Sequence, residues 1–231
     1  WMNYPKVLTF DCYGTLINWE KGILQALSPF LKPGAPEPEE LLGLYARLEA
    51  EEERIFRPYK EILRAVAQRM AQSLGLDGRR LEWVFVESLP HWPVFADVAE
   101  VLPRLKERGF LLAIISNTDR DLLAASVRQM GVEFDWLITA EEAKAYKPAP
   151  EIFTLALKRI GLPKEEIWHV AQSHYHDIVP VSRLGITTVW LNRRAGKNPY
   201  GATLPARGQP DILCQDLKEL ERFLIEQSST A

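Results

Sequence analysis

The stretch KVLTFDCYGTL, residues 6–16, decides the fold. Its run Val7–Phe10 is apolar, rich in β-forming residues and free of charge, which predicts a strand buried on both faces, as in a parallel sheet. Asp11 follows directly, where such a strand ends. Ligands of open α/β sheets bind beyond the carboxyl ends of the strands, and an unpaired carboxylate is costly to bury. Asp11 is therefore a candidate functional residue, with a cap of the next turn as the plain alternative.

The composition is that of an ordinary globular protein. The 231 residues are 47% hydrophobic and 26% charged, and the net charge of −3 leaves no basic footprint for nucleic acid. No apolar run approaches the roughly 20 residues that cross a membrane, and the N-terminus lacks a signal-peptide pattern. Cys12 and Cys214 have no metal-binding spacing and suit buried thiols. We expect a cytoplasmic protein with one large domain, or one that carries a smaller domain.

A long helical segment follows the first strand. After Leu16 the apolar residues recur at helical spacing until about Leu89. We expect residues 17–92 to form an all-helical cap domain, inserted into a catalytic core of residues 1–16 and 93–231. Within the cap, a loop over residues 33–40 is expected to lead into a long helix over residues 41–56. An acidic run in that helix is interpreted as a solvated face: Glu49, Glu51, Glu52 and Glu53.

In the second part of the chain, short strand patterns alternate with helices, which predicts a doubly wound parallel α/β sheet. Polar residues follow four of the strands: Asp11, Ser116 with Asn117, Lys147, and Asp177. Because parallel strands end at the same edge, we expect these side chains to converge. Taken singly, they could be a plain turn, a solvated lysine and a helix cap. Those separate explanations account poorly for the presence of polar residues after all four strands.

Four motifs in this order resemble the haloacid dehalogenase superfamily of hydrolases. They are DCYGTL at 11–16, ISN at 115–117, AYKPAPEIF at 145–153 and HVAQSHYHD at 169–177. The resemblance covers the whole chain and places the cap between the first and second motifs. It implies a Rossmann-like core and an aspartate nucleophile, and it is far more specific for the superfamily than for the substrate.

Two positions are similar to the metal-free 2-haloacid dehalogenase branch. Phosphatases of the superfamily have a general acid two residues after the nucleophile and a Mg²⁺-binding carboxylate in the fourth motif. Here those positions hold Tyr13, a residue with an ordinary pKa of about 10, and Gln172, a neutral amide that Mg²⁺ does not favour. We therefore expect no metal, no cofactor and a small-molecule substrate. A Mg²⁺-dependent small-molecule phosphatase and a non-catalytic member that binds a ligand or partner are the alternatives.

The resemblance also implies catalytic roles. Asp11 would displace halide from a short 2-haloalkanoic acid, and water would hydrolyse the resulting aspartyl ester. A nearby cation favours an ionised carboxyl, so Lys147 would keep Asp11 ionised. Asp177 would position Lys147 or help to activate water. The carboxylates of substrate and nucleophile would be bound by Thr15, Ser116 and Asn117.

The remaining expectations concern substrate binding. Arg47, on the first long cap helix, is the match for an arginine that receives halide or substrate carboxylate, with a surface arginine as the alternative. The other expected substrate-binding residues are Tyr13, Cys12, His174 and Gln172; His174 and His176 are unusual for this branch. An apolar lining, with cap core as the alternative for about two of its four members, is expected from Trp19, Tyr45, Phe56 and Tyr59. The oligomeric state stays open, with a homodimer among the alternatives.

Overall fold

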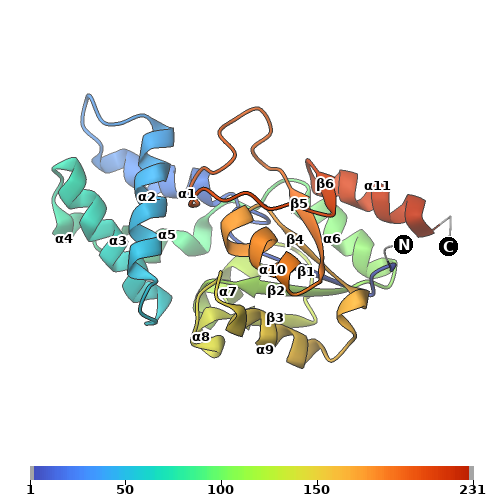
Figure 1. The fold of residues 1–231 in the computed structure, drawn as a ribbon. Helices are drawn as coiled ribbons and strands as arrows, with labels where there is room; N and C mark the ends of the chain where they lie inside the picture. Colours follow the sequence, from blue (N-terminus) through green and yellow to red (C-terminus); the bar gives the residue numbers. More distant parts are fainter. Residues whose placement is uncertain (1–2, 229–231) are drawn as a thin grey trace.

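The computed structural model describes residues 3–228. A six-stranded parallel sheet forms its centre, in the order β3-β2-β1-β4-β5-β6 (Figure 1). The predicted doubly wound α/β architecture is confirmed. The strands are β1 (Val7–Phe10), β2 (Leu111–Ser116), β3 (Trp136–Thr139), β4 (Ile167–Ala171), β5 (Thr187–Leu191) and β6 (Ile212–Cys214).

Strand β1 occupies the middle of the sheet and determines where the site lies. All four of its residues are buried, as its uncharged, β-forming sequence predicts. Phe10 pairs with Ile114 of β2 on one side and with Val170 of β4 on the other. The order of the strands reverses between β1 and β4, the place where open α/β sheets bind their ligands. The residues that follow these strands therefore meet at a preformed crevice.

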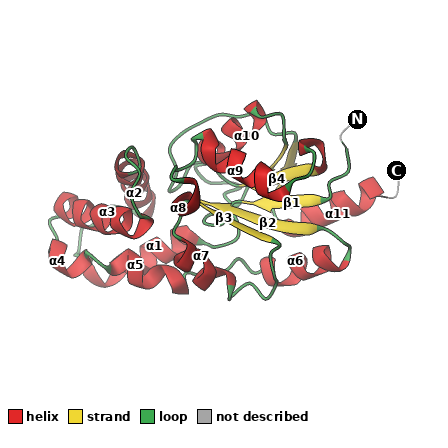
Figure 2. Cartoon of the chain, turned by 90° about the horizontal axis from the view of Figure 1, so that it is seen from below, coloured by secondary structure: helices red, strands yellow, loops and turns green. Residues whose placement is uncertain are grey.

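Helices cover both faces of the sheet (Figure 2). One face carries α6 (Val98–Glu107), α7 (Arg120–Val127) and α11 (Leu217–Ser228), and the other carries α9 (Pro150–Ile160) and α10 (Val179–Arg183). In α6 the buried residues recur at helical spacing, as Val98, Val101, Leu102 and Leu105. A buried side chain of this kind contributes roughly 1.5–3 kcal/mol, so one apolar stripe per helix accounts for its docking. The short α8 (Ala140–Ala143) follows β3.

The cap helices, defined as α1–α5, lie beside the sheet (Figure 1). They are α1 (Trp19–Leu27), α2 (Pro38–Glu52), α3 (Tyr59–Leu74), α4 (Gly78–Leu81) and α5 (Val84–Ser88), with 3-10 turns η1 (Ser28–Phe30) and η2 (Leu89–His91). Helix α2 begins earlier than predicted. Glu37 and Glu40 form a capping box and Pro38 takes the first helical position, which starts the helix inside the expected loop. The helix also ends at Glu52, before the expected residue 56.

The chain leaves and re-enters the core at one place. The Asn18 amide donates to the Pro93 carbonyl at 2.7 Å, and the Phe95 amide donates to the Leu16 carbonyl at 3.0 Å. The segments on either side of the cap helices are therefore hydrogen-bonded to each other. Among residues 3–228, no helix combines the length and the apolar character needed to cross a membrane.

Candidate active site

The loop after β1 presents the Asp11 carboxylate. The backbone amides of residues 15–17 all donate to the Cys12 carbonyl, which makes the loop tight. Gly14 has φ +96°, and a Cβ there would lie 2.8 Å from the nearest side chain, so this turn requires glycine. The turn brings Thr15 back toward the strand, where its hydroxyl donates to Asp11 Oδ2 at 2.8 Å.

Lys147 holds the site together from the loop beyond β3. Its ammonium donates to Asp11 Oδ1 at 2.7 Å, to Asp177 Oδ1 at 2.8 Å and to the Ile115 carbonyl at 2.9 Å. The side chain is 1% exposed, and these bonds use all three donors of the ammonium. Asn117 fixes the backbone of Lys147, accepting from its amide at 2.6 Å and donating to its carbonyl at 3.1 Å.

Asp177 lies on a one-turn π-helix, η4 (His174–Ile178), directly after β4. Such turns are frequent at functional sites. Asp177 Oδ1 also lies 2.8 Å from His169 Nε2, and His169 Nδ1 lies 2.8 Å from the Thr9 hydroxyl. Residues of β1 and β4 therefore position Asp177, and Asp177 in turn positions Lys147.

The buried charges of Asp11, Lys147 and Asp177 shift one another's pKa values. Burial would lower the pKa of Lys147, but Asp11 and Asp177 outweigh it and raise that pKa, so the ammonium stays charged. Burial raises the pKa of Asp11; Lys147 opposes this rise and Asp177 adds to it. Burial also acts upward on Asp177, but Lys147 and His169 bring its pKa down to about 2. Asp177 is therefore the permanently charged partner, and Asp11 is the more basic carboxylate of the pair.

The Asp11 cavity, as we call it, opens between this cluster and the cap. It offers about 30 Å³ to the centres of water-sized molecules, which is room for about two waters. Ser116, at the end of β2, lines it with a buried hydroxyl that has no hydrogen-bond partner within residues 3–228. The full lining is Asp11, Tyr13, Trp19, Glu49, Glu53, Tyr59, Ser116, Asn117, Lys147 and His176.

The cap contributes acids to this cavity. Glu49 is only 4% exposed, and its Oε1 accepts from Tyr59 Oη at 2.5 Å and from Tyr45 Oη at 3.1 Å. Burial raises the pKa of Glu49 to about 7, although both tyrosine bonds act downward. Burial and the charge of Glu49 raise the pKa of Glu53 well above its ordinary value. The interpretation of this run as a solvated face is therefore wrong for Glu49 and Glu53.

Arg47 is not a site residue in this structure, which corrects that prediction. It is exposed on α2, two positions before Glu49, and does not line the Asp11 cavity. On a helix, a step of two residues turns a side chain to a different face. The cap therefore presents carboxyl groups to Asp11 where a guanidinium was expected.

Cys12 and His174, two of the expected substrate-binding residues, also lie outside the cavity lining. Cys12 is fully buried, and burial and the neighbouring Asp11 raise its pKa well above the ordinary value, so it is packed as a neutral thiol. His174 packs on Trp190 with ring centroids 4.5 Å apart, and its Nδ1 accepts from the Gly208 amide at 3.0 Å. His174 thus anchors a surface loop, whereas His176 lines the cavity.

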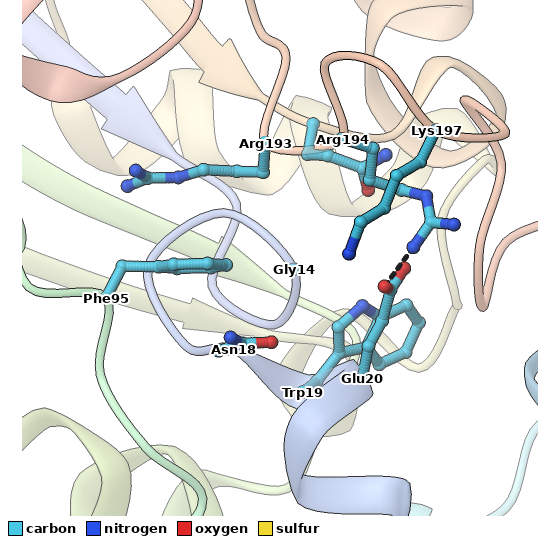
Figure 3. A pocket seen from close by; sticks show the side chains of 9 residues that line it. Gly14, Asn18, Trp19, Glu20, Phe95, Arg193, Arg194 and Lys197 are labelled. Carbon is cyan, nitrogen blue, oxygen red and sulfur yellow. Dashed lines mark hydrogen bonds and ion pairs between the residues drawn. The ribbon is translucent and has the colours of Figure 1, made fainter. Parts of the chain in front are cut away.

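Gln172 lines a second cavity, near the loop of Gly14. Figure 3 shows that cavity and the Gly14 loop. The side-chain amide of Gln172 donates to the Pro199 carbonyl at 3.2 Å, while its backbone amide donates to the Thr15 hydroxyl at 3.0 Å. It therefore supports the loop that carries Asp11 and Thr15 and does not line the Asp11 cavity. Within residues 3–228, no three or more His, Cys, Asp and Glu side chains are grouped to hold a metal.

At the second cavity, ion pairs join the core to the cap helices. Figure 3 shows the pair between Arg194 of the core and Glu20 of α1. Arg194 also bonds to Glu39 of α2, at 2.7 Å, and is only 5% exposed. Arg193 forms a two-pronged pair with Asp97 at 2.7 and 2.9 Å. The arginines are thus structural ties, and Trp19 lines both cavities.

The four aromatic candidates divide into two groups. Trp19 and Tyr59 line the Asp11 cavity. Tyr45 lies behind them with its ring edge-on to Trp19, and Phe56 packs on Tyr146 with centroids 5.5 Å apart. Tyr13 also lines the cavity, and its hydroxyl lies 2.8 Å from Ser126 Oγ.

Sequence reasoning missed three contributors. His169 carried a signal, because it is a polar residue inside the apolar strand IWHVA. Glu49 carried a weaker one, since it stands one turn after Tyr45 and so shares its face of the helix. Glu53 carried none that separates it from its acidic neighbours.

Known proteins resemble this chain over most of its length. A sequence model described as haloacid dehalogenase-like hydrolase matches residues 5–178. An (S)-2-haloacid dehalogenase of Pseudomonas putida is 28% identical, covering 94% of this chain and 96% of its own. A dehalogenase solved as an intermediate complex superposes with a TM-score of 0.82 at 21% identity, covering 96% of this chain and 98% of its own. The L-2-haloacid dehalogenase of Xanthobacter autotrophicus with chloropropionic acid covalently bound gives 0.78 at 22% identity with the same coverage.

Proposed function

Because the chain belongs to the haloacid dehalogenase-like hydrolases, we propose that it displaces halide from short 2-haloalkanoic acids through an ester on Asp11. The observation that carries this proposal is a buried carboxylate that opens onto a small cavity, with its charge partner Lys147 fixed by three bonds. The names of the relatives agree with it.

The chemistry proceeds in two steps. An Asp11 oxygen attacks the carbon that bears the halogen, and the bond to the halogen breaks as halide leaves with the electron pair. Water then attacks the carbonyl of the aspartyl ester, which releases the 2-hydroxyacid and regenerates Asp11. Lys147 and Thr15 hold the two carboxylate oxygens in place throughout. Fixed geometry of this kind supplies much of the rate advantage of an enzyme.

Tyr13 argues against the phosphatase alternative. Burial raises its pKa well above the ordinary value. Its hydroxyl is therefore a poor general acid for an alkoxide leaving group. A neutral reacting carbon with a good leaving group needs neither that acid nor a metal to neutralise phosphate charge. We propose a metal-free reaction on these grounds, with residues 17–92 as the cap that covers it.

We propose the cytoplasm as its compartment and a small molecule as its substrate. Cys12 and Cys214 are both buried and unpaired, which suits a reducing environment.

Halide release tests the proposed function. The wild-type protein is incubated with 2-chloropropionate and chloroacetate, with and without EDTA, beside the Asp11→Asn variant. We expect halide release by the wild type that EDTA does not reduce, and none by the variant. Phosphate release from a generic phosphate ester that requires added Mg²⁺, without halide release, would overturn the proposal.

A further inference from the structure

The lining of the Asp11 cavity offers no unpaired cation to a free carboxylate. Lys147 is the only lysine or arginine among the lining residues, all of which are described, and its three donors are already used. His176 is the other basic group, but burial lowers its pKa to about 4, which leaves it neutral. A substrate carboxylate would therefore find no unpaired positive charge in this lining.

The cap side of the cavity is acidic instead. Glu49 and Glu53 are four residues apart, at the end of α2, so they share one face. Glu49 Oε1 is engaged by two tyrosines. Glu53 Oε1 is a buried atom with no hydrogen-bond partner in the described part of the chain. When this pair is ionised it repels an anion and attracts a hydrogen-bond donor.

Ser116 supplies a second unsatisfied group in the same cavity. The residue is fully buried, and its hydroxyl lacks a partner among residues 3–228. A buried polar group without a partner costs free energy that a ligand can recover. One free hydroxyl donor and one free carboxyl acceptor match a primary amide, which has a carbonyl acceptor and two N–H donors.

We infer that Glu49 and Glu53 select the substrate by charge, so that the Asp11 cavity prefers a short, neutral 2-haloamide to the corresponding 2-haloalkanoate. The inference rests on the proposed displacement of halide by Asp11 and names the substrate class of that reaction. Ser116 donates to the amide carbonyl, and Glu53 accepts from its N–H. An Asp11 oxygen attacks the carbon that bears the halogen, and halide leaves with the bonding electrons. Water then hydrolyses the aspartyl ester and releases a 2-hydroxyamide. The proton released passes to solvent, and the amide bond stays intact.

Ionisation of the acid pair controls the preference. The groups that face it from the surrounding elements are Tyr45, Tyr59, Tyr146, Tyr175, Asp11, Lys147 and His176. The four tyrosines and His176 stay neutral near neutral pH, because burial raises the pKa of each phenol above its ordinary value and lowers that of the imidazole. Alkaline pH therefore adds negative charge on the cap side and sharpens discrimination against the carboxylate.

Chloroacetamide and chloroacetate test the inference, because they are almost the same size and differ in charge. We expect the kcat/KM for halide release at about pH 8.5 to favour the amide by tenfold or more, an order expected for one unpaired charge at close range. We expect Glu49→Gln, Glu53→Gln and the double variant to reduce this ratio, mainly by improving use of chloroacetate. Glu51→Gln is the matched control, because Glu51 lies in the same run, is exposed, and pairs with Arg69.

The outcomes separate the two proposals. If the wild type releases no halide from either compound, or if Asp11→Asn releases halide as fast as the wild type, the proposed displacement fails. If the wild type uses chloroacetate as well as chloroacetamide at alkaline pH, or if the variants leave the ratio unchanged, the selection by charge is wrong while the displacement stands. The single variants keep the test usable should the double variant fold poorly.

Discussion

Replacing Glu49 with glutamine should stabilise the protein at alkaline pH and leave it nearly unchanged at acid pH. Burial raises the pKa of Glu49 from 4.5 to about 7. A pKa difference of one corresponds to about 1.36 kcal/mol, so the rise from 4.5 to about 7 is worth about 3.4 kcal/mol. The folded pKa is the higher one, so this stability is complete below the unfolded pKa and is lost as pH rises through 7. Glutamine does not titrate, and its carbonyl can still accept from Tyr45 and Tyr59.

Urea unfolding of both proteins measures this effect. Between about pH 5 and about pH 8.5, the unfolding free energy of Glu49→Gln should gain about 2.5 kcal/mol on that of the wild type. Groups that titrate equally in both proteins cancel in the difference. The exposed Glu51→Gln should show no gain of this kind. If the unfolding free energies of Glu49→Gln and the wild type changed with pH in parallel, the claim that burial raises the pKa of Glu49 would be refuted.

Three further substitutions test the rest of the site. Asp11→Asn should lower the turnover number for halide release by several orders of magnitude. Its urea unfolding midpoint should equal or exceed that of the wild type, because Lys147 then balances the charge of Asp177 alone. A variant that does not fold would contradict this. Lys147→Ala should lower the unfolding free energy by about 3–5 kcal/mol, because it leaves two buried carboxylates unpaired; an unfolding midpoint near that of the wild type would count against the cluster. Asp119→Ala should cost about 0.5–2 kcal/mol in the same assay, since Asp119 accepts from the first amides of α3 at 2.8 and 3.0 Å; no change would show that this tie between cap and core is dispensable.

The core of the site was predictable because strand order and polarity are local in the sequence. Val7–Phe10 reads as a buried strand without any knowledge of its neighbours, and a parallel sheet brings the ends of its strands to one edge. Asp11, Lys147 and Asp177 therefore had to approach one another once the strands were placed. The resemblance also implied that Lys147 meets Asp11 and Asp177, but nothing local indicated its third bond, to the Ile115 carbonyl, or the fixing of its backbone by Asn117.

The cap was harder because its contribution depends on how α2 is rotated against the core. Arg47 and Glu49 differ by two positions, and a rotation of the helix decides which of them reaches Asp11. Acidic runs are usually solvated, so the sequence alone favoured the wrong face. Tyr45 and Tyr59 donate hydrogen bonds that stabilise the buried carboxyl of Glu49. Tyr59 belongs to α3, however, so its contact with Glu49 depends on how the two helices pack. Similarly, nothing local indicated that His174 would turn toward Trp190 while His176 turned inward.

The most direct test of the account is a single turnover in ¹⁸O-labelled water with enzyme in excess over chloroacetamide or 2-chloropropionate. If Asp11 forms an ester, water attacks the aspartyl carbonyl, and mass spectrometry of the peptide that carries Asp11 should show heavy oxygen in its side chain. The hydroxyl of the first product molecule should then carry the unlabelled oxygen that Asp11 brought to the reaction. Heavy oxygen in that product, with Asp11 unlabelled, would mean that water attacks the substrate directly and would contradict Asp11 as the nucleophile.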